Sequence, residues 1–214
     1  MGYNKCMTKE ERTKKELLQL REMLKFEREL WACGNEFVCG IDEVGRGPLA
    51  GPVVTAAVIL PKDFDVPGVN DSKKLSEKRR EELYSVIMEK ALAVGIGRVE
   101  PARIDEINIL EATKEAMKMA VENLSLRPDV LLIDALVLKD VDIPQRAIVH
   151  GDALSVSIAA ASIIAKVTRD REMVEMAKLY PGYAFEKNKG YGTKAHYEGL
   201  AVLGPTPIHR RSFL

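Results

Sequence analysis

The stretch GIDEVGRGPLAGPVV at residues 40–54 decides the fold of this chain, because it joins two apolar strands through two acids and a glycine-rich turn. The second apolar run, residues 53–60, shows no polar alternation and predicts a strand covered on both faces. Asp42 and Glu43 stand at the end of the first strand, before the turn at residues 45–47. Adjacent side chains of a strand face opposite ways, so both acids share one site only if the strand ends or bends there. We expect the glycine turn to end it.

Acids also follow the apolar strands predicted further along the chain. Asp134 comes directly after residues 130–133, and Asp152 follows residues 147–149. A single acid of this kind is more often a turn former or a helix cap, but a carboxylate at a buried strand end costs free energy unless it is paired or binds a cation. Three such ends converging would place four carboxylates around one point. An oxygen-only set of this kind suits Mg²⁺ or Mn²⁺, and two such ions support in-line displacement at phosphorus.

The rest of the chain alternates between strands and helices. Strands are predicted at residues 37–41, 53–60, 91–99, 130–133 and 147–149, and helices at 8–31, from Ser76, at 104–124 and at 155–173. This order is typical of an α/β protein with a mixed sheet covered by helices. The helix at 155–173 consists largely of small residues, so we expect it to lie close against the sheet.

The composition excludes several classes of protein. With 46% hydrophobic and 30% charged residues in 214, the chain resembles an ordinary soluble globular protein. No apolar stretch reaches the ~18 residues of a membrane span, and residues 1–7 lack the apolar core of a secretory signal. The three cysteines, Cys6, Cys33 and Cys39, form no C-x-x-C pair, which argues against a disulfide framework or a zinc site. We therefore expect a cytoplasmic protein.

The formal net charge is zero, so nucleic acid could be bound only by a local basic face. The segment 185–214 is such a candidate for tracking phosphates, with two acids against Lys187, Lys189, Lys194, Arg210 and Arg211. A second basic run is either a solvated helix face or a nucleic-acid contact, and comprises Lys73, Lys74, Lys78, Arg79 and Arg80. The three histidines have no ligand spacing, so structural or substrate-contact roles are expected for His150, His196 and His209.

The motif at residues 40–54 strongly resembles the opening motif of bacterial type 2 ribonuclease H (ribonuclease HII). The similarity continues in order through DSKKLS at 71–76, LID at 132–134 and GD at 151–152, and then through segments within 155–170, 180–183, 189–193 and 204–213. It spans residues 36–213, nearly the whole core. One departure follows Asp134, where many relatives continue with Gly-Asn and this chain has Ala135-Leu136.

The resemblance implies a ribonuclease H-like mixed five-stranded sheet flanked by helices, with a small C-terminal helical subdomain. We expect an N-terminal helical extension at residues 1–34, a catalytic core at 35–175 and a substrate-binding subdomain at 176–214. It also implies an endonuclease that hydrolyses the RNA strand of RNA–DNA hybrids. The family nicks DNA on the 5′ side of embedded ribonucleotides, leaving 3′-hydroxyl and 5′-phosphate ends.

The family's functional residues transfer onto matching positions of this chain. The four active-site acids, which hold Mg²⁺ or Mn²⁺, match Asp42, Glu43, Asp134 and Asp152. The turn that contacts the ribose 2′-hydroxyl matches Gly45, Arg46 and Gly47, and the tyrosine packed beside the RNA–DNA junction matches Tyr191. The partners expected are hybrid duplexes and DNA with embedded ribonucleotides, with no membrane, and the protein is expected to be a monomer.

Three alternatives stand beside this reading. A junction resolvase would use the same carboxylates and metal, but a DNA-only enzyme has no 2′-hydroxyl for the Gly-Arg-Gly turn to contact. Type 3 ribonuclease H differs in the corresponding turn. In a non-catalytic nucleic-acid-binding module, the acids would have no role in turnover.

Overall fold

The computed structural model describes residues 8–214, so the sequence predictions about residues 1–7, Cys6 included, lie outside the described part. Its centre is a five-stranded sheet in the order β3-β2-β1-β4-β5. Antiparallel pairing joins β1 (Val38–Val44) to β2 (Val53–Ile59) and β2 to β3 (Ala93–Val99). Parallel pairing joins β1 to β4 (Val130–Asp134) and β4 to β5 (Gln145–Ile148). The predicted mixed sheet is therefore confirmed.

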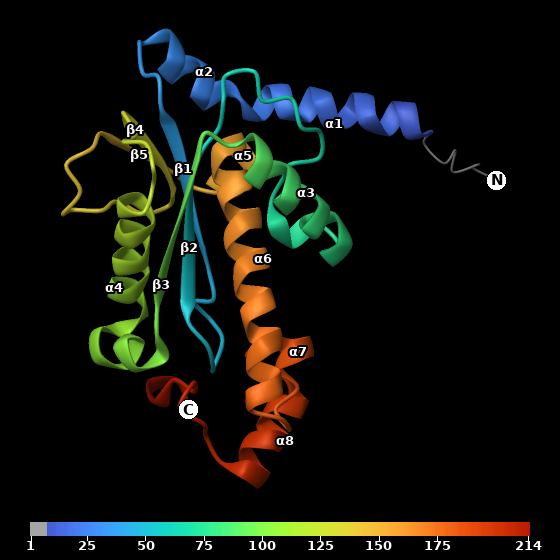
Figure 1. Cartoon of the computed structure of the whole chain (residues 1–214), viewed down its shortest axis with the longest axis vertical. Helices are drawn as coiled ribbons and strands as arrows, with labels where there is room; N and C mark the ends of the chain where they lie inside the picture. The colour runs from blue at the N-terminus through green and yellow to red at the C-terminus, as the bar shows by residue number, and fades with distance from the viewer. Residues whose placement is uncertain (1–7) are drawn as a thin grey trace.

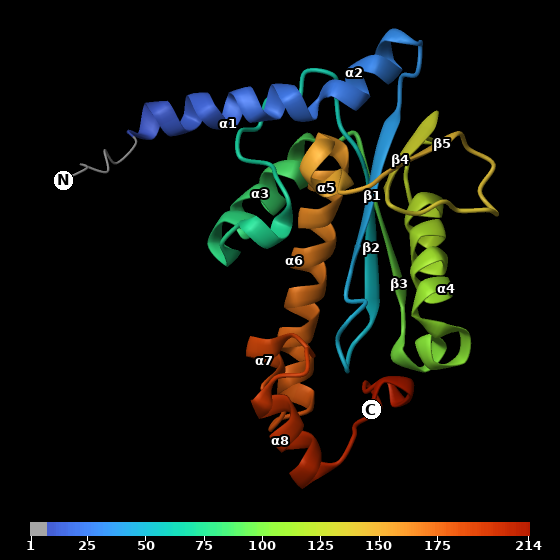
Figure 2. The same ribbon diagram turned by 180° about the vertical axis from the view of Figure 1, so that it is seen from behind.

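Helices cover both faces of the sheet (Figures 1 and 2). One face packs against α4 (Pro101–Glu122), and the other against α6 (Val156–Leu179), beside which lies α3 (Glu77–Lys90). Every residue of β2 is buried, as its unbroken apolar run predicts. The small residues of α6 let it approach β1 closely. A Cβ added to Gly40 would lie 2.1 Å from the carbonyl carbon of Ser157.

The N-terminal helix predicted as one element is two helices, which is a correction to the sequence analysis. Thr8 and Glu11 form the expected capping box of α1 (Lys9–Met23), and α2 (Lys25–Ala32) follows after a break at Leu24. The two helices pack on different apolar clusters. The end of α1 packs with α3 and α6, whereas Phe26 and Leu30 of α2 pack beside β1 and β4, and Trp31 contacts both clusters. Each helix can therefore present its apolar side to its own cluster.

The first strand is longer than the predicted run at residues 37–41, although it ends, as expected, directly before the glycine turn. It continues through both acids, with Asp42 paired to Ala56 and Glu43 to Thr55 on β2. The pairing with β2 continues to Val44 and Val54 and so supports β1 beyond Ile41. Asp42 and Glu43 therefore lie among the last three residues of β1, where the strand ends before the glycine turn and both acids can reach one site.

The region around Asp152 shows a second set of shifted boundaries. The fifth strand runs over residues 145–148 rather than 147–149, because its backbone pairs with β4 from Leu131 and Gln145 to Asp134 and Ile148. A short helix, α5 (Gly151–Leu154), then precedes α6. Ser155 caps α6 by accepting a hydrogen bond from the Ile158 amide. Asp152 belongs to α5 and does not cap α6.

In the last part of the chain, α7 (Phe185–Asn188) and α8 (Lys194–Leu203) lie at the far end of α6 (Figure 1). The 3₁₀ turn η2 (Arg211–Phe213) packs instead, through Phe213, beside β2, β3 and α4. An earlier 3₁₀ turn, η1 (Ser72–Lys74), precedes α3. Tyr183 and Phe185 pack with Met173 of α6 in a small apolar cluster. None of the helices formed by residues 8–214 has the length and apolar character that crossing a bilayer requires.

Candidate active site

The two central parallel strands bring three of the predicted acids to one edge of the sheet. The pairing of β1 with β4 ends at Ile41 and Ile133, one residue before Asp42 and Asp134. These two carboxylates therefore leave neighbouring strands at the same level. Glu43 follows directly on β1, and its amide donates a 2.8 Å hydrogen bond to Oδ1 of Asp42.

The fourth acid reaches the same edge through α5. The Gly151 amide donates a 2.8 Å hydrogen bond to Oδ1 of Asp134, which ties the start of α5 to the end of β4. A Cβ at Gly151 would lie 2.6 Å from Cδ1 of Ile158, so the side chain of α6 packed behind Gly151 favours glycine there. Asp152, the next residue, is buried beside them. We call Asp42, Glu43, Asp134 and Asp152 the acid edge.

In the acid edge, ionisation of one carboxyl group makes ionisation of its neighbours less favourable. Burial raises the pKa of Asp42 well above its ordinary value, and the charges of Glu43 and Asp134 raise it further. Burial also raises the pKa of Glu43, against the opposing effect of Arg46, and Asp134 adds to the rise. Burial raises the pKa of Asp152 as well, with a like-charge contribution from Asp134. A cluster of this kind is stabilised by an added cation.

The donor set fits a hard divalent cation. All its ligating atoms are carboxylate oxygens, and the buried Oε2 of Glu43 finds no hydrogen-bond partner among residues 8–214. Within the same residues, no three acids, histidines or cysteines are gathered as a ready-made metal site. One oxygen of each acid is instead engaged by an internal donor, from Glu43, Arg46, Gly151 and Lys73 respectively.

Sequence reasoning missed two polar residues beside the acid edge. The Lys73 ammonium lies 3.6 Å from Oδ2 of Asp152, and the Ser162 hydroxyl lowers the pKa of Asp42 by hydrogen bonding. Lys73 was left open as part of a basic run, and its neighbour Lys74 pairs with Asp71 instead. The signal was the position of Lys73 inside the 71–76 motif, not the charge of the run.

The predicted glycine turn lies next to the acids and is fixed from beneath. Gly45 has φ 92°, and a Cβ there would lie 2.3 Å from Nε of Arg169. Arg46 extends over the turn and its guanidinium lies 3.5 Å from Oε1 of Glu43. The Tyr191 ring lies beside Gly47, since a Cβ at Gly47 would come within 3.7 Å of it. We call residues 45–47 and Tyr191 the recognition surface.

Two buried arginines hold this surface through backbone carbonyls. Arg169 donates to the carbonyls of Ala50, Pro52 and Lys189, at 2.9–3.1 Å. Arg210 donates to the carbonyls of Gly45, Arg46 and Gly51, at 2.5–3.0 Å. Burial and the nearby charge of Arg169 lower the pKa of Arg210 to about 9. The expectation that Arg210 tracks phosphates is therefore wrong, because its side chain is fully buried.

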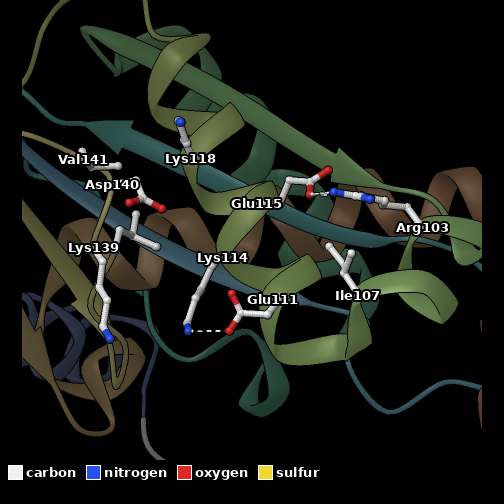
Figure 3. Close-up of a pocket in the computed structure, with 10 residues that line it drawn as sticks. Arg103, Ile107, Glu111, Lys114, Glu115, Lys118, Lys139, Asp140 and Val141 are labelled. Atoms are coloured by element: carbon white, nitrogen blue, oxygen red, sulfur yellow. Dashed lines mark hydrogen bonds and ion pairs between the residues drawn. The ribbon is translucent and has the colours of Figure 1, made fainter.

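The cavity between α4 and the segment 138–141, about 470 Å³ in volume, is separate from the acid edge (Figure 3). Its charged side chains are largely paired among themselves, Arg103 with Glu115 and Lys114 with Glu111. None of the four acids lines it. The candidate active site therefore lies outside this cavity, at the ends of β1 and β4.

Comparisons with known proteins agree with this geometry. The sequence profile of the family described as ribonuclease HII matches residues 39–214. A ribonuclease HII of Ligilactobacillus salivarius is 60% identical over 212 residues, covering 99% of this chain and 82% of the relative. One of Enterococcus faecalis is 60% identical over 199 residues, covering 93% of this chain and 78% of that relative.

Solved structures give the same result. Ribonuclease H2 of Pyrococcus horikoshii is 30% identical with a TM-score of 0.66, covering 82% of this chain and 93% of that one. The Archaeoglobus fulgidus ribonuclease HII, solved in complex with PCNA, is 29% identical with a TM-score of 0.70, covering 83% and 95%. A Bst ribonuclease HIII solved with Mn²⁺ is 22% identical with a TM-score of 0.62, covering 83% and 67%, and shares the fold.

Proposed function

The chain belongs to the ribonuclease HII family, and from this membership we propose how its own residues carry out the reaction. It is a metal-dependent endonuclease of the ribonuclease H type, which hydrolyses the RNA strand of RNA–DNA hybrids. We assign to it the nicking of DNA 5′ to an embedded ribonucleotide, with 3′-hydroxyl and 5′-phosphate products. The observation that carries this assignment is the acid edge lying directly beside the turn at residues 45–47.

The acid edge would hold the divalent metal, Mg²⁺ or Mn²⁺, through Asp42, Glu43, Asp134 and Asp152. When bound, two such ions activate water and stabilise the leaving oxygen in phosphodiester hydrolysis. The protein's part is to keep four carboxyl groups at one edge of the sheet, where their repulsion favours cation binding. Lys73, beside Asp152, adds a positive charge where a phosphate would approach.

The recognition surface would supply the preference for ribonucleotides. A glycine turn exposes backbone N–H and carbonyl groups, and the ribose 2′-hydroxyl both donates and accepts hydrogen bonds. Because Arg169 and Arg210 fix the turn, its polar groups would meet the sugar without rearranging. Tyr191, which is 42% exposed, would pack its ring beside the RNA–DNA junction. A junction resolvase would have no use for these features.

The remaining assignments concern organisation and setting. We propose that residues 35–175 are the catalytic core, that 176–214 form a substrate-binding subdomain, and that 1–34 are an extension. The protein would act as a monomer on nucleic acid. The free Cys33 and Cys39 suit the reducing conditions of the cytoplasm.

The first test is cleavage of a labelled DNA duplex that carries one ribonucleotide, with Mg²⁺ or Mn²⁺. We expect a single nick on the 5′ side of the ribonucleotide, abolished by a chelator and by Asp134→Asn. Asp140→Asn is the matched control, since it removes an exposed carboxylate from the loop after β4 and should cut like the wild type. A wild-type rate in Asp134→Asn would contradict the assignment of the acid edge.

The second test addresses Tyr191. We expect Tyr191→Ala to reduce cutting at a single ribonucleotide about 10-fold more than cutting of a long hybrid, because stacking beside a sugar or base contributes about 1–3 kcal/mol. The rates on both substrates would be compared at one salt concentration. Equal losses on the two substrates would remove the junction role and leave the nuclease assignment intact.

A further inference from the structure

Two buried histidines form a hydrogen-bonded chain that ends on Tyr191. Nε2 of His196 and Nε2 of His209 lie 2.9 Å apart, and both side chains are buried. Nδ1 of His196 lies 2.9 Å from the Tyr191 carbonyl, and Nδ1 of His209 lies 2.9 Å from the Thr206 amide. The chain therefore runs from Thr206 through both imidazoles to Tyr191.

The two ends of this chain fix where the protons lie. The Thr206 amide only donates, so Nδ1 of His209 accepts and the proton of a neutral His209 is on Nε2. That Nε2–H donates to Nε2 of His196, which leaves the proton of a neutral His196 on Nδ1. The Tyr191 carbonyl only accepts, and it receives that Nδ1–H. A proton added to either ring would face another N–H.

The surroundings keep both rings neutral and in place. Burial lowers the pKa of His196, and burial together with the charge of His196 lowers the pKa of His209 to about 4. The Phe185 ring meets His196 edge-on at 5.1 Å, and Tyr183 lies 5.1 Å from His209. Rotation of either imidazole would break a hydrogen bond of the chain.

The chain ends at the part of the recognition surface that is not held by the arginines. Arg169 and Arg210 bind carbonyls of residues 45–52 and of Lys189, but not that of Tyr191. The Tyr191 carbonyl accepts instead from the Thr193 amide and from His196. The second contact is the one that anchors Tyr191 to the segment carrying His209, which pairs with Ala50 in the loop behind the glycine turn.

We propose that His209 and His196 act as a positioning pair that holds the Tyr191 backbone, and thereby its ring, against the glycine turn. This inference rests on the role proposed for Tyr191. Neither histidine contacts a nucleotide in this scheme, so both differ from catalytic residues. Their requirement is directional: position 196 must donate at Nδ1, and position 209 must accept at Nδ1 while donating at Nε2.

Amide substitutions test this direction. Asparagine places its amide near the Nδ1 position of histidine, whereas glutamine places it near Nε2. His196→Asn should keep the donor to Tyr191 and retain the wild-type ratio of single-ribonucleotide cutting to hybrid cutting. His196→Gln should lose that donor, and its ratio should fall about 10-fold, as expected for a misplaced contact group. Melting temperatures would show that both variants fold.

The same variants exclude a purely structural role. If the pair served only stability, both variants would lose stability and the ratio would stay that of the wild type in each. Such a result, or a ratio retained in His196→Gln and lost in His196→Asn, would overturn the proposal.

A spectroscopic measurement tests the hydrogen bonds of the two histidines without measuring enzyme activity. In protein labelled with ¹⁵N-histidine at about pH 7, nitrogen shifts should show His196 protonated on Nδ1 and His209 on Nε2. His196→Asn and His209→Asn identify the signals by deleting them, and the exposed His150 provides a reference. The opposite tautomer at either position would overturn the proposal. If the wild type cut neither substrate, the proposed function would fail. The tautomers would still show whether the two histidines hydrogen-bond to each other and to Tyr191 in the proposed direction.

Discussion

The acid edge and the recognition surface meet at the end of β1, yet they satisfy their polar groups in opposite ways. In the acid edge, like charges raise one another's pKa and Oε2 of Glu43 has no partner among residues 8–214. Beneath the recognition surface, all six hydrogen-bonding nitrogens of Arg169 and Arg210 donate to backbone carbonyls. The first region is incomplete without a cation, and the second is complete by itself.

This difference matches what each region has to do. A metal site gains affinity from unpaired carboxylates, because the bound ion cancels the repulsion between them that destabilises the folded protein. A surface that distinguishes ribose from deoxyribose needs fixed donors and acceptors, since a mobile turn would lose free energy in ordering at each encounter. Activity should therefore be most sensitive to the acids, and folding most sensitive to the arginines.

The largest effect is expected for Asp42→Asn, which should change activity and stability in opposite directions. Turnover should fall by at least ~10³-fold, the scale of losing a group that stabilises charge in the transition state. Stability without metal should rise at neutral pH, because burial and like charge oppose ionised Asp42. Cleavage rates and urea unfolding on the same preparations measure both.

A matched carboxylate should show the reverse. Asp129 accepts hydrogen bonds from the Glu36 and Phe37 amides, which lower its pKa. Asp129→Asn should therefore reduce stability and leave turnover near that of the wild type. A loss of stability in Asp42→Asn equal to that in Asp129→Asn would contradict the view that the acid edge is a charged site under repulsion.

The second prediction concerns the arginines. Arg210→Met should reduce the free energy of unfolding by about 3–5 kcal/mol, because it leaves buried carbonyls of Gly45, Arg46 and Gly51 without donors. The neighbouring Arg211→Met is the control, since that side chain is exposed and should change stability by less than about 0.5 kcal/mol. Similar losses in both variants would show that the carbonyl contacts are not what stabilises the turn.

The third prediction is a pH dependence that metal removes. Folded-state pKa values of Asp42, Glu43 and Asp152 are raised above the unfolded values. Between the unfolded-state and the folded-state pKa values, the folded protein therefore binds more protons than the unfolded protein does. The free energy of unfolding falls as pH rises through this range. Bound Mg²⁺ favours the ionised acids, so it should raise the melting temperature more at about pH 7.5 than at about pH 5.

The magnitude and control of this metal effect follow from mass action. At a Mg²⁺ concentration about 100 times the dissociation constant, binding should add about 2.7 kcal/mol to the stability at neutral pH. Calorimetry with Mg²⁺ or with a chelator measures it, and Asp134→Asn should reduce the difference. An equal Mg²⁺ effect at both pH values would show that the ion stabilises the protein somewhere other than the acid edge.

The same two regions differ in how far the sequence reveals them. The acids and the glycine turn were predicted because they are local patterns: apolar strands ending in acids, and glycines next to each other. The arginines were not, because their partners are backbone carbonyls up to 165 residues away and leave no local pattern. The histidine pair was not, because the sequence does not show that two rings 13 residues apart meet. Similarly, β1 continues past its apolar run because β2 pairs with it, which only the tertiary fold determines.

The smallest effect is expected directly after Asp134, where this chain departs from many relatives. Ala135 has φ 53°, the left-handed region that favours glycine, while its amide donates to the Ile148 carbonyl. Ala135→Gly should therefore stabilise the protein by about 1 kcal/mol, because glycine adopts this conformation without steric cost.

The same substitution at Ala195 on the exposed face of α8 should have the opposite sign and cost about 1 kcal/mol, because glycine weakens a right-handed helix. Urea unfolding of both variants measures the pair. If both were destabilising, the turn after Asp134 would be relaxed with alanine, and no backbone strain would be stored at the acid edge. The expected pair of signs would instead show that the acid edge carries strain in its backbone as well as repulsion among its charges.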